Sequence, residues 1–178
     1  QLILTTIQNI ILDLWGVMRY IPFCAMAGTA IWLTIEWMEN KKNPQRDPEW
    51  KKKGIRLLWI IYLLQVAMIT FFSREPGSRN GIDWHLFETW GTSAKSHAFV
   101  IENILLFVPF GILLPLTAKK FSKPLPCVKL GIAFSCGIEL MQLITQRGYC
   151  QVDDVIMNGL GTWIGFLAFR AIDQKGKE

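Results

Sequence analysis

The sequence predicts an all-α, polytopic membrane helical bundle, and two observations support this fold class. Of the 178 residues, 51% are hydrophobic and 12% are aromatic, and the mean hydropathy is positive. The apolar residues also gather in long stretches of roughly 20 residues, the length that a helix needs to cross a bilayer. Such segments must be helical, because lipid offers no partner to backbone hydrogen-bonding groups.

Five apolar stretches have this length, and they define the predicted spans. They cover residues 18–38, 54–73, 98–118, 125–144 and 155–172. Pro109 and Pro115 lie in the third span, and each lacks a backbone donor. We therefore expect that span to kink or end there, and a kink would open a cavity beside Asn103. Residues 18–178 form a single transmembrane domain.

Residues 1–17 form a separate amphipathic helix in this prediction. Its polar side chains share one face: Thr5, Thr6, Gln8, Asn9 and Asp13. The apolar face lies opposite. Two arrangements fit this pattern, a helix that lies in the membrane interface and a helix that packs its polar face inside the bundle.

Basic residues alternate between the connections and predict the orientation. They are concentrated at 41–56, after the first span, at 119–129, after the third, and in the tail at 170–177. Cytoplasmic loops carry the excess of Lys and Arg, so both loops and the C-terminus should be cytoplasmic. We expect each lysine to be solvated or to contact lipid phosphates. The net charge of +5 is then a topology signal, and we expect no nucleic-acid partner.

Polar residues recur at helical spacing inside the last two spans. Ser135, Glu139 and Gln142 stand at i, i+4 and i+7, and Asp154 and Asn158 stand at i, i+4. An ionisable group at membrane depth costs roughly 2.5–3.5 kcal/mol on insertion scales, so it normally pairs, faces a cavity or serves a site. Under the predicted orientation these residues lie near the outer ends of their spans. The sequence therefore predicts a polar pocket that opens to the outside.

Two glycines predict how the last span packs. Gly161 and Gly165 repeat the step of four residues that separates Asp154 from Asn158. Small residues at this spacing let two membrane helices approach closely. We expect this stripe to contact a neighbouring helix and to direct Asp154 and Asn158 inward.

Two segments of the chain, IENILLFVPFGILLPL and FSCGIELMQLITQRGYCQVDDVIMNGLGTWIGFLAF, resemble the VanZ-like family, which is named for a teicoplanin-resistance protein of Gram-positive bacteria. The resemblance covers about 57–169. It implies a protein of the bacterial cell membrane that lowers sensitivity to glycopeptides with lipid tails, and it does not supply a reaction. The motif residues are Asn103, Phe107, Pro109, Phe110, Gly111, Ser135, Glu139, Gln142, Arg147, Asp153, Asp154, Asn158, Gly161 and Gly165.

The candidate site follows from the chemistry of these side chains. Glu139 and Asp154 are the candidate catalytic groups, each as a general base. Glu139, Asp153 and Asp154 offer the hard oxygen ligands that suit Mg²⁺, Mn²⁺ or Ca²⁺. Arginines of the outer connections would hold a phosphate. The candidate ligand-binding residues are Asn103, Ser135, Gln142, Arg147, Asp153, Asn158, Arg74 and Arg79.

Several functions remain open at this point. The pocket modifies an amphiphile of the outer leaflet, such as a lipid-linked cell-wall precursor, or it binds an envelope lipid or the lipoglycopeptide without catalysis. Ion-coupled transport is a third hypothesis. The fourth is that the polar residues only pair with one another and lock the helices. Two smaller expectations are a short interfacial helix at 82–90 and no disulfide framework among the four cysteines.

Overall fold

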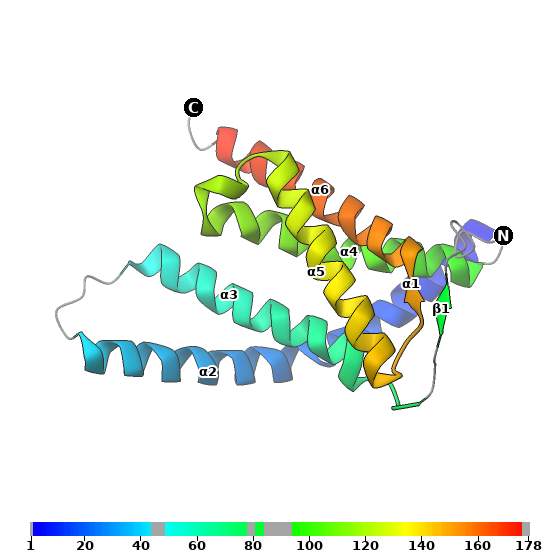
Figure 1. Cartoon of the computed structure of the whole chain (residues 1–178), viewed down its shortest axis with the longest axis horizontal. Coiled ribbons are helices and arrows are strands. Elements are labelled where there is room, and N and C mark those ends of the chain that lie inside the picture. The colour runs from blue at the N-terminus through cyan, green and yellow to red at the C-terminus, as the bar shows by residue number, and fades with distance from the viewer. Residues whose placement is uncertain (1, 44–48, 78–80, 84–93, 176–178) are drawn as a thin grey trace.

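A computed structural model describes residues 2–43, 49–77, 81–83 and 94–175. The described chain is a bundle of long helices with only short elements between them (Figure 1). The helices are α1 (Leu2–Met18), α2 (Ile21–Lys42), α3 (Trp50–Ala67), α4 (Ala94–Thr117), α5 (Pro124–Thr145) and α6 (Val152–Lys175). A π-helical turn, Met68–Phe72, extends α3. A 3₁₀ turn, Lys119–Phe121, precedes α5.

The predicted fold class and spans are confirmed. Within the described residues, 5 helices are long and apolar enough to cross a membrane: Ile21–Lys42, Trp50–Phe72, His97–Thr117, Pro124–Thr145 and Val152–Gln174. Pro109 and Pro115 both lie inside α4, which ends at Thr117. The third span thus continues past Pro109 and ends two residues after Pro115, and a kink at either proline stays a prediction.

Helices α4 and α6 make the most extensive contact between helices, and their backbones touch. A Cβ atom added at Gly161 would overlap the carbonyl oxygen of Ile104, and one added at Gly165 would overlap that of Val108. The predicted packing of the glycine stripe is thus confirmed, with α4 as its partner. This contact brings the first turns of α6 beside Asn103.

Aromatic rings fill the core between α3, α4 and α5. The ring of Phe110 stacks on that of Phe134 with centroids 5.2 Å apart, and Trp59 meets Phe110 edge-on at 5.3 Å. Phe107 is completely buried beside them. Since each of the three helices contributes a ring, this cluster fixes their relative positions.

Helix α2 is joined to α3 by buried and half-buried ion pairs. The Nζ atom of Lys53 lies 2.5 Å from Oε2 of Glu36, and NH1 of Arg56 lies 2.7 Å from Oε1 of Glu39. Arg56 also contacts Glu36 at 3.3 Å. The expectation that every lysine of this connection is solvated or contacts lipid is therefore wrong for Lys53. Glu36 and Glu39 lie on α2, and whether they meet Lys53 and Arg56 depends on how α2 packs against α3.

The N-terminal helix α1 packs against α4. Thr6, on its polar face, is buried, while Ile3 and Ile7, on its apolar face, are exposed. Thr5 and Gln8 of the same polar face are exposed, so the two predicted arrangements of this helix both stay predictions.

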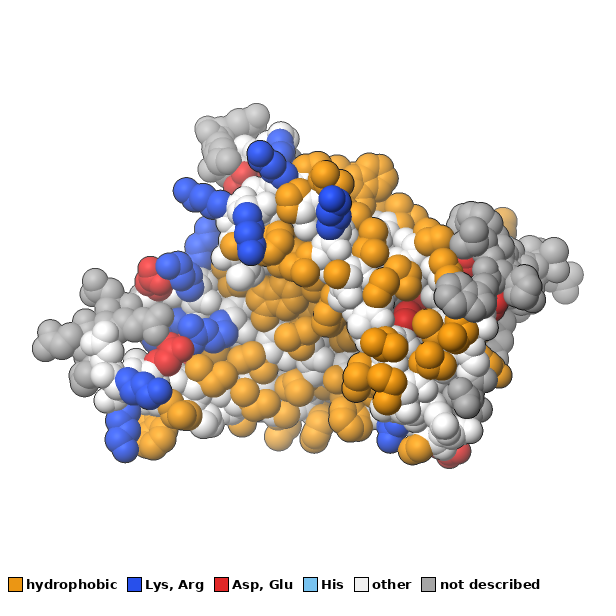
Figure 2. Space-filling model, in the orientation of Figure 1, with side chains coloured by type: hydrophobic (Ala, Val, Ile, Leu, Met, Phe, Trp, Pro, Cys, Tyr) orange, Lys and Arg blue, Asp and Glu red, His pale blue; other side chains and the backbone are white. Residues whose placement is uncertain are grey.

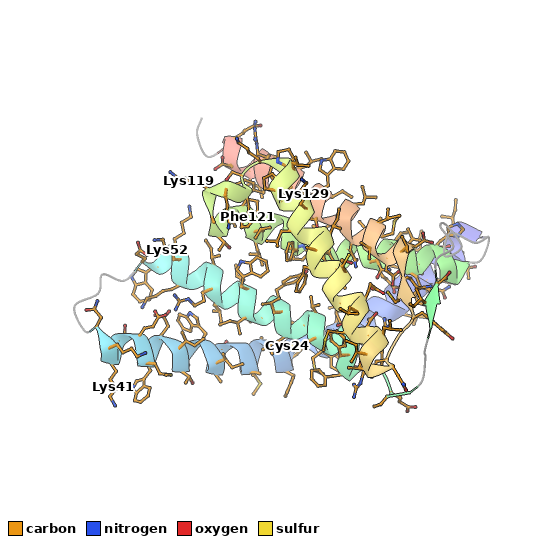
Figure 3. All side chains as sticks on the ribbon, in the orientation of Figure 1. Cys24, Lys41, Lys52, Lys119, Phe121 and Lys129 are labelled. Atoms are coloured by element: carbon orange, nitrogen blue, oxygen red, sulfur yellow. The ribbon has the colours of Figure 1, made fainter. Side chains whose placement is uncertain are left out.

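Basic side chains are unevenly distributed along the bundle. Many lysine and arginine side chains gather at the end of the bundle where α2, α4 and α6 end and where α3 and α5 begin (Figure 2). Lys41, Lys52 and Lys119 mark this end in Figure 3. At the opposite end β1 (Ile82–Asp83) pairs in parallel with β2 (Cys150–Gln151). Ile82 and Asp83 are thus in a strand, so the interfacial helix predicted from residue 82 is wrong at its start, and 84–90 lie outside the described residues.

Candidate functional site

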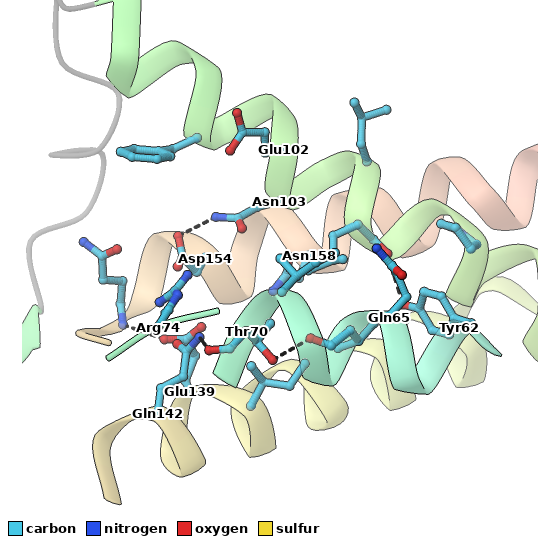
Figure 4. A pocket seen from close by; sticks show the side chains of 18 of the residues that line it. Tyr62, Gln65, Thr70, Arg74, Glu102, Asn103, Glu139, Gln142, Asp154 and Asn158 are labelled. Atoms are coloured by element: carbon cyan, nitrogen blue, oxygen red, sulfur yellow. Dashed lines mark hydrogen bonds between the residues drawn. The ribbon is translucent and has the colours of Figure 1, made fainter. Parts of the chain in front are cut away.

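A cavity of about 340 Å³ lies among α3, α4, α5 and α6, towards the end of the bundle that carries the short strands. This volume is within the range of small-molecule sites, about 300–1,000 Å³. One part of its wall is apolar and includes Phe99, Leu105, Leu106, Pro109 and Ile138. The polar part, seen in Figure 4, comprises Tyr62, Gln65, Thr70, Arg74, Glu102, Asn103, Glu139, Gln142, Asp154 and Asn158.

Helix α5 supplies one polar wall. Ser135, Glu139 and Gln142 are all buried, as their spacing on one helix face predicts. Oε2 of Glu139 accepts a hydrogen bond of 3.0 Å from the backbone N–H of Gln151, and Nε2 of Gln142 donates to the carbonyl of Thr70 at 3.2 Å. The two side chains therefore connect α5 with β2 and with the π-helical turn while they line the cavity.

The first turns of α6 supply the facing wall. Nδ2 of Asn103 donates to Oδ1 of Asp154 at 2.6 Å, and Nδ2 of Asn158 donates to Oγ of Ser135 at 2.8 Å. These bonds link α6 with α4 and with α5. Asp154 also lies in the first turn of its helix, where the helix dipole favours a negative charge.

Arg74 follows the π-helical turn and lies beside both carboxyl groups of the cavity (Figure 4). It is close enough to Glu139 and to Asp154 to interact electrostatically with each. Gly148 leaves room for it, because a Cβ atom there would stand 2.8 Å from NH1 of Arg74. The positive charge of one guanidinium group thus interacts with two carboxyl groups, of which Glu139 is buried and Asp154 is half-buried.

Arg147 was predicted to bind ligand, and its guanidinium is instead bonded to the backbone. NH1 donates to the carbonyl of Phe71 at 2.6 Å and to that of Arg74 at 3.3 Å. Arg147 is not among the residues that line the cavity. It holds the end of the π-helical turn, and with it the backbone of Arg74.

The other predicted residues divide between the cavity and its surroundings. Ser135 and Asp153 are buried but do not line the cavity, and Arg79 lies outside the described residues. The predicted residues that do line it are Asn103, Glu139, Gln142, Asp154, Asn158 and Arg74.

The expected metal ligands do not form a group. Among the described residues, no three His, Cys, Asp or Glu side chains lie together as a metal site requires. Asp153 and Asp154 are neighbours in a helix, so their side chains project about 100° apart. The cavity therefore receives Glu139 and Asp154, while Asp153 is excluded from its lining.

Sequence reasoning missed several lining residues. Glu102 directly precedes Asn103, and Gln65 and Thr70 interrupt an apolar span, so their polarity was an available signal. The backbone N–H of Gln151 that bonds Glu139 had no signal, because every residue except proline carries one.

Cys150 offers a chemical probe next to the cavity. It lies in β2, outside the spans, as a half-buried free thiol. Burial raises the pKa of this thiol, and the charge of Glu139 raises it further. The thiolate is the reactive form, so a protein with Cys150 as its single cysteine should react with an uncharged maleimide more slowly than N-acetylcysteine at neutral pH. The rate should rise only at higher pH, and equal rates at neutral pH would contradict this prediction.

These features define a multi-pass helical membrane protein with a mixed polar and apolar cavity near one end of its spans. The sequence model described as VanZ/LLP1 matches residues 59–173, more than half of the chain, and the protein belongs to this family. The match begins in α3 and leaves out α1 and α2.

One relative is Protein VanZ of Enterococcus faecium, which is 27% identical over 112 residues. The alignment covers 62% of this chain and 65% of that protein, so the chain spans just under two thirds of its relative. No solved structure matches the chain.

Proposed function

We propose that this protein binds an amphiphile of the bacterial cell envelope in its cavity, and that this binding lowers sensitivity to teicoplanin-type lipoglycopeptides. The observation that carries the proposal is the composition of the cavity wall. Arg74, Glu139 and Asp154 form a charged part, and Leu105 and Pro109 belong to an apolar part of the same cavity. An amphiphile has the same division between a polar head and apolar chains.

The apolar wall supports a ligand that reaches the bilayer. Phe99 and Leu105 line the cavity and are 39% and 44% exposed. Both belong to the span His97–Thr117, so this part of the cavity wall lies at the depth of the membrane. A lipid chain leaving the cavity past these residues would stay in apolar surroundings.

We propose that the charged part of the cavity belongs to the outer leaflet. Most of the described basic side chains, Arg74 and Arg147 excepted, lie at the opposite end of the bundle (Figure 2), and this is the end that the positive-inside rule assigns to the cytoplasm. The C-terminus is cytoplasmic in this orientation, and a ligand would enter from outside.

The hydrogen bonding supports a binding site over a purely structural lock. Asn158 is 3% exposed and lines the cavity, and its Oδ1 atom has no hydrogen-bond partner among the described residues. A buried acceptor without a partner costs about 1–3 kcal/mol. A ligand with a donor at this position would remove that cost. Catalysis by Glu139 or Asp154, and ion-coupled transport, remain predictions.

The test is antibiotic susceptibility of a Gram-positive host that expresses the wild type or Asp154→Asn at matched membrane abundance. Asn keeps the shape of Asp and removes its charge. We expect the wild type to raise the inhibitory concentration of teicoplanin more than that of vancomycin, and Asp154→Asn to return it to the empty-vector value. Glu49→Gln removes a carboxylate from the exposed ion pair with Lys52 and should protect like the wild type.

Two results would contradict the proposal. If the wild type does not alter the teicoplanin concentration, the function assigned to the protein is wrong. If Asp154→Asn and the wild type protect equally, the charged part of the cavity has no role in protection.

A further inference from the structure

We propose that the cavity is selective for a lipid headgroup that carries both a primary ammonium and a phosphate. The ammonium lies against Glu139 and Asp154, and the phosphate lies against Arg74. This inference rests on the proposed function only in that the cavity binds an amphiphile, and it specifies which headgroup chemistry the cavity takes.

The first argument is the balance of charge in the cavity wall. Among the described residues that line the cavity, Arg74 is the only basic side chain, and it lies beside Glu139 and Asp154. Asn103 and the N–H of Gln151 donate to these carboxyl groups but carry no charge. An uncompensated charge inside a protein is costly, so a cationic ligand group would stabilise the site. A phosphate or pyrophosphate alone would add negative charge to an already acidic wall.

The second argument is independent and comes from Asn158. Its Nδ2 atom is committed to Ser135, while Oδ1 is buried without a partner among the described residues. The atom is an acceptor, so the missing group is a donor. A primary ammonium has three N–H donors for Glu139, Asp154 and Asn158, whereas a quaternary ammonium has none.

The phosphate position follows from the two arginines. Arg147 donates to two backbone carbonyls and does not line the cavity. Arg74 does line the cavity, while its NH1 atom donates to the carbonyl of Arg147 at 3.5 Å, and it supplies the guanidinium beside the ligand in the described wall. A guanidinium binds a phosphate through paired N–H donors. One anion-binding group beside an acidic pair matches a zwitterion better than a headgroup with several phosphates.

The test is lipid competition on the purified 178-residue chain. Native mass spectrometry would follow the binding of phosphatidylethanolamine, phosphatidylcholine and phosphatidylglycerol with identical acyl chains. We expect phosphatidylethanolamine to bind about tenfold or more tightly than either competitor, as expected for a charged hydrogen bond. Glu139→Gln and Asp154→Asn should remove this preference, and Glu49→Gln should keep it.

The wild-type selectivity decides the question even if a variant fails to fold. Equal binding of phosphatidylethanolamine and phosphatidylcholine, or tighter binding of phosphatidylglycerol, would overturn the headgroup assignment. Protection against teicoplanin would still test the proposed function separately. O-phosphorylethanolamine, the headgroup without chains, should displace the lipid only at a much higher concentration. Displacement at equal concentration would show that the ligand is a soluble ammonium phosphate, and it would overturn the assignment to a lipid.

Discussion

Replacing Gly165 by alanine is expected to destabilise the bundle strongly, while the same change at Gly137 should leave it intact. A Cβ atom at position 165 would overlap the carbonyl oxygen of Val108, a backbone atom that no rotamer change can move away. Overpacking costs about 1–3 kcal/mol even where side chains can adjust, and we expect the upper end of this range. At Gly137, on α5, nothing lies within 4 Å of the added atom.

The two variants form a matched pair. Both replace a helical glycine, so both gain the helix propensity of alanine, about 0.8–1.0 kcal/mol. The measurement is the midpoint of thermal unfolding in detergent, followed by the monodisperse fraction on size exclusion. Gly137→Ala should have an unchanged or higher midpoint, and Gly165→Ala a lower one. Equal midpoints would mean that α4 and α6 are not in backbone contact at Gly165.

The same contact determines the cavity. Helix α4 carries Asn103 and α6 carries Asp154, and the 2.6 Å bond between them requires the close approach at Gly161 and Gly165. A wider separation of the helices would break this bond. Gly165→Ala should therefore reduce headgroup selectivity in whatever fraction of the protein remains folded.

The fold was predictable because it depends on composition and spacing. Apolar runs of membrane length identify the spans without any knowledge of their neighbours. The step of four residues between Gly161 and Gly165 likewise marks a contact face, although it does not name α4 as the partner. The pairing of Glu36 with Lys53 and Arg56 was missed, because it requires the packing register of α2 on α3.

The site was predictable where helical periodicity sets the direction of a side chain. Glu139 and Gln142 share a face of α5, and both line the cavity. Ser135 shares this face too, but it lies deeper and bonds Asn158. Helical periodicity does not predict the direction of side chains beyond the end of α5. Gln146 caps α5 with a left-handed φ of 54°, so the direction of the Arg147 side chain does not follow from the helix.

Replacing Arg147 by glutamine is expected to lower stability and headgroup selectivity together. Its guanidinium bonds the carbonyl of Phe71, which also accepts from the backbone N–H of Arg74, and the carbonyl of Arg74 itself, at the end of the π-helical turn. A hydrogen bond with a charged partner contributes about 1.5–3 kcal/mol, so the unfolding midpoint should fall measurably. Arg74 should also shift, because the backbone that positions it is no longer held.

Arg147→Lys separates this positioning role from direct contact with a ligand. The lysine ammonium keeps the charge but lacks the fork that reaches two carbonyls, so it should restore only part of the unfolding midpoint. If Arg147 acts by positioning Arg74, the preference for phosphatidylethanolamine should recover in the same proportion as the midpoint. If Arg147 instead contacts the phosphate, Arg147→Gln would lose binding while the midpoint stays at the wild-type value. That second result would move Arg147 into the binding site, as its position in the sequence first indicated.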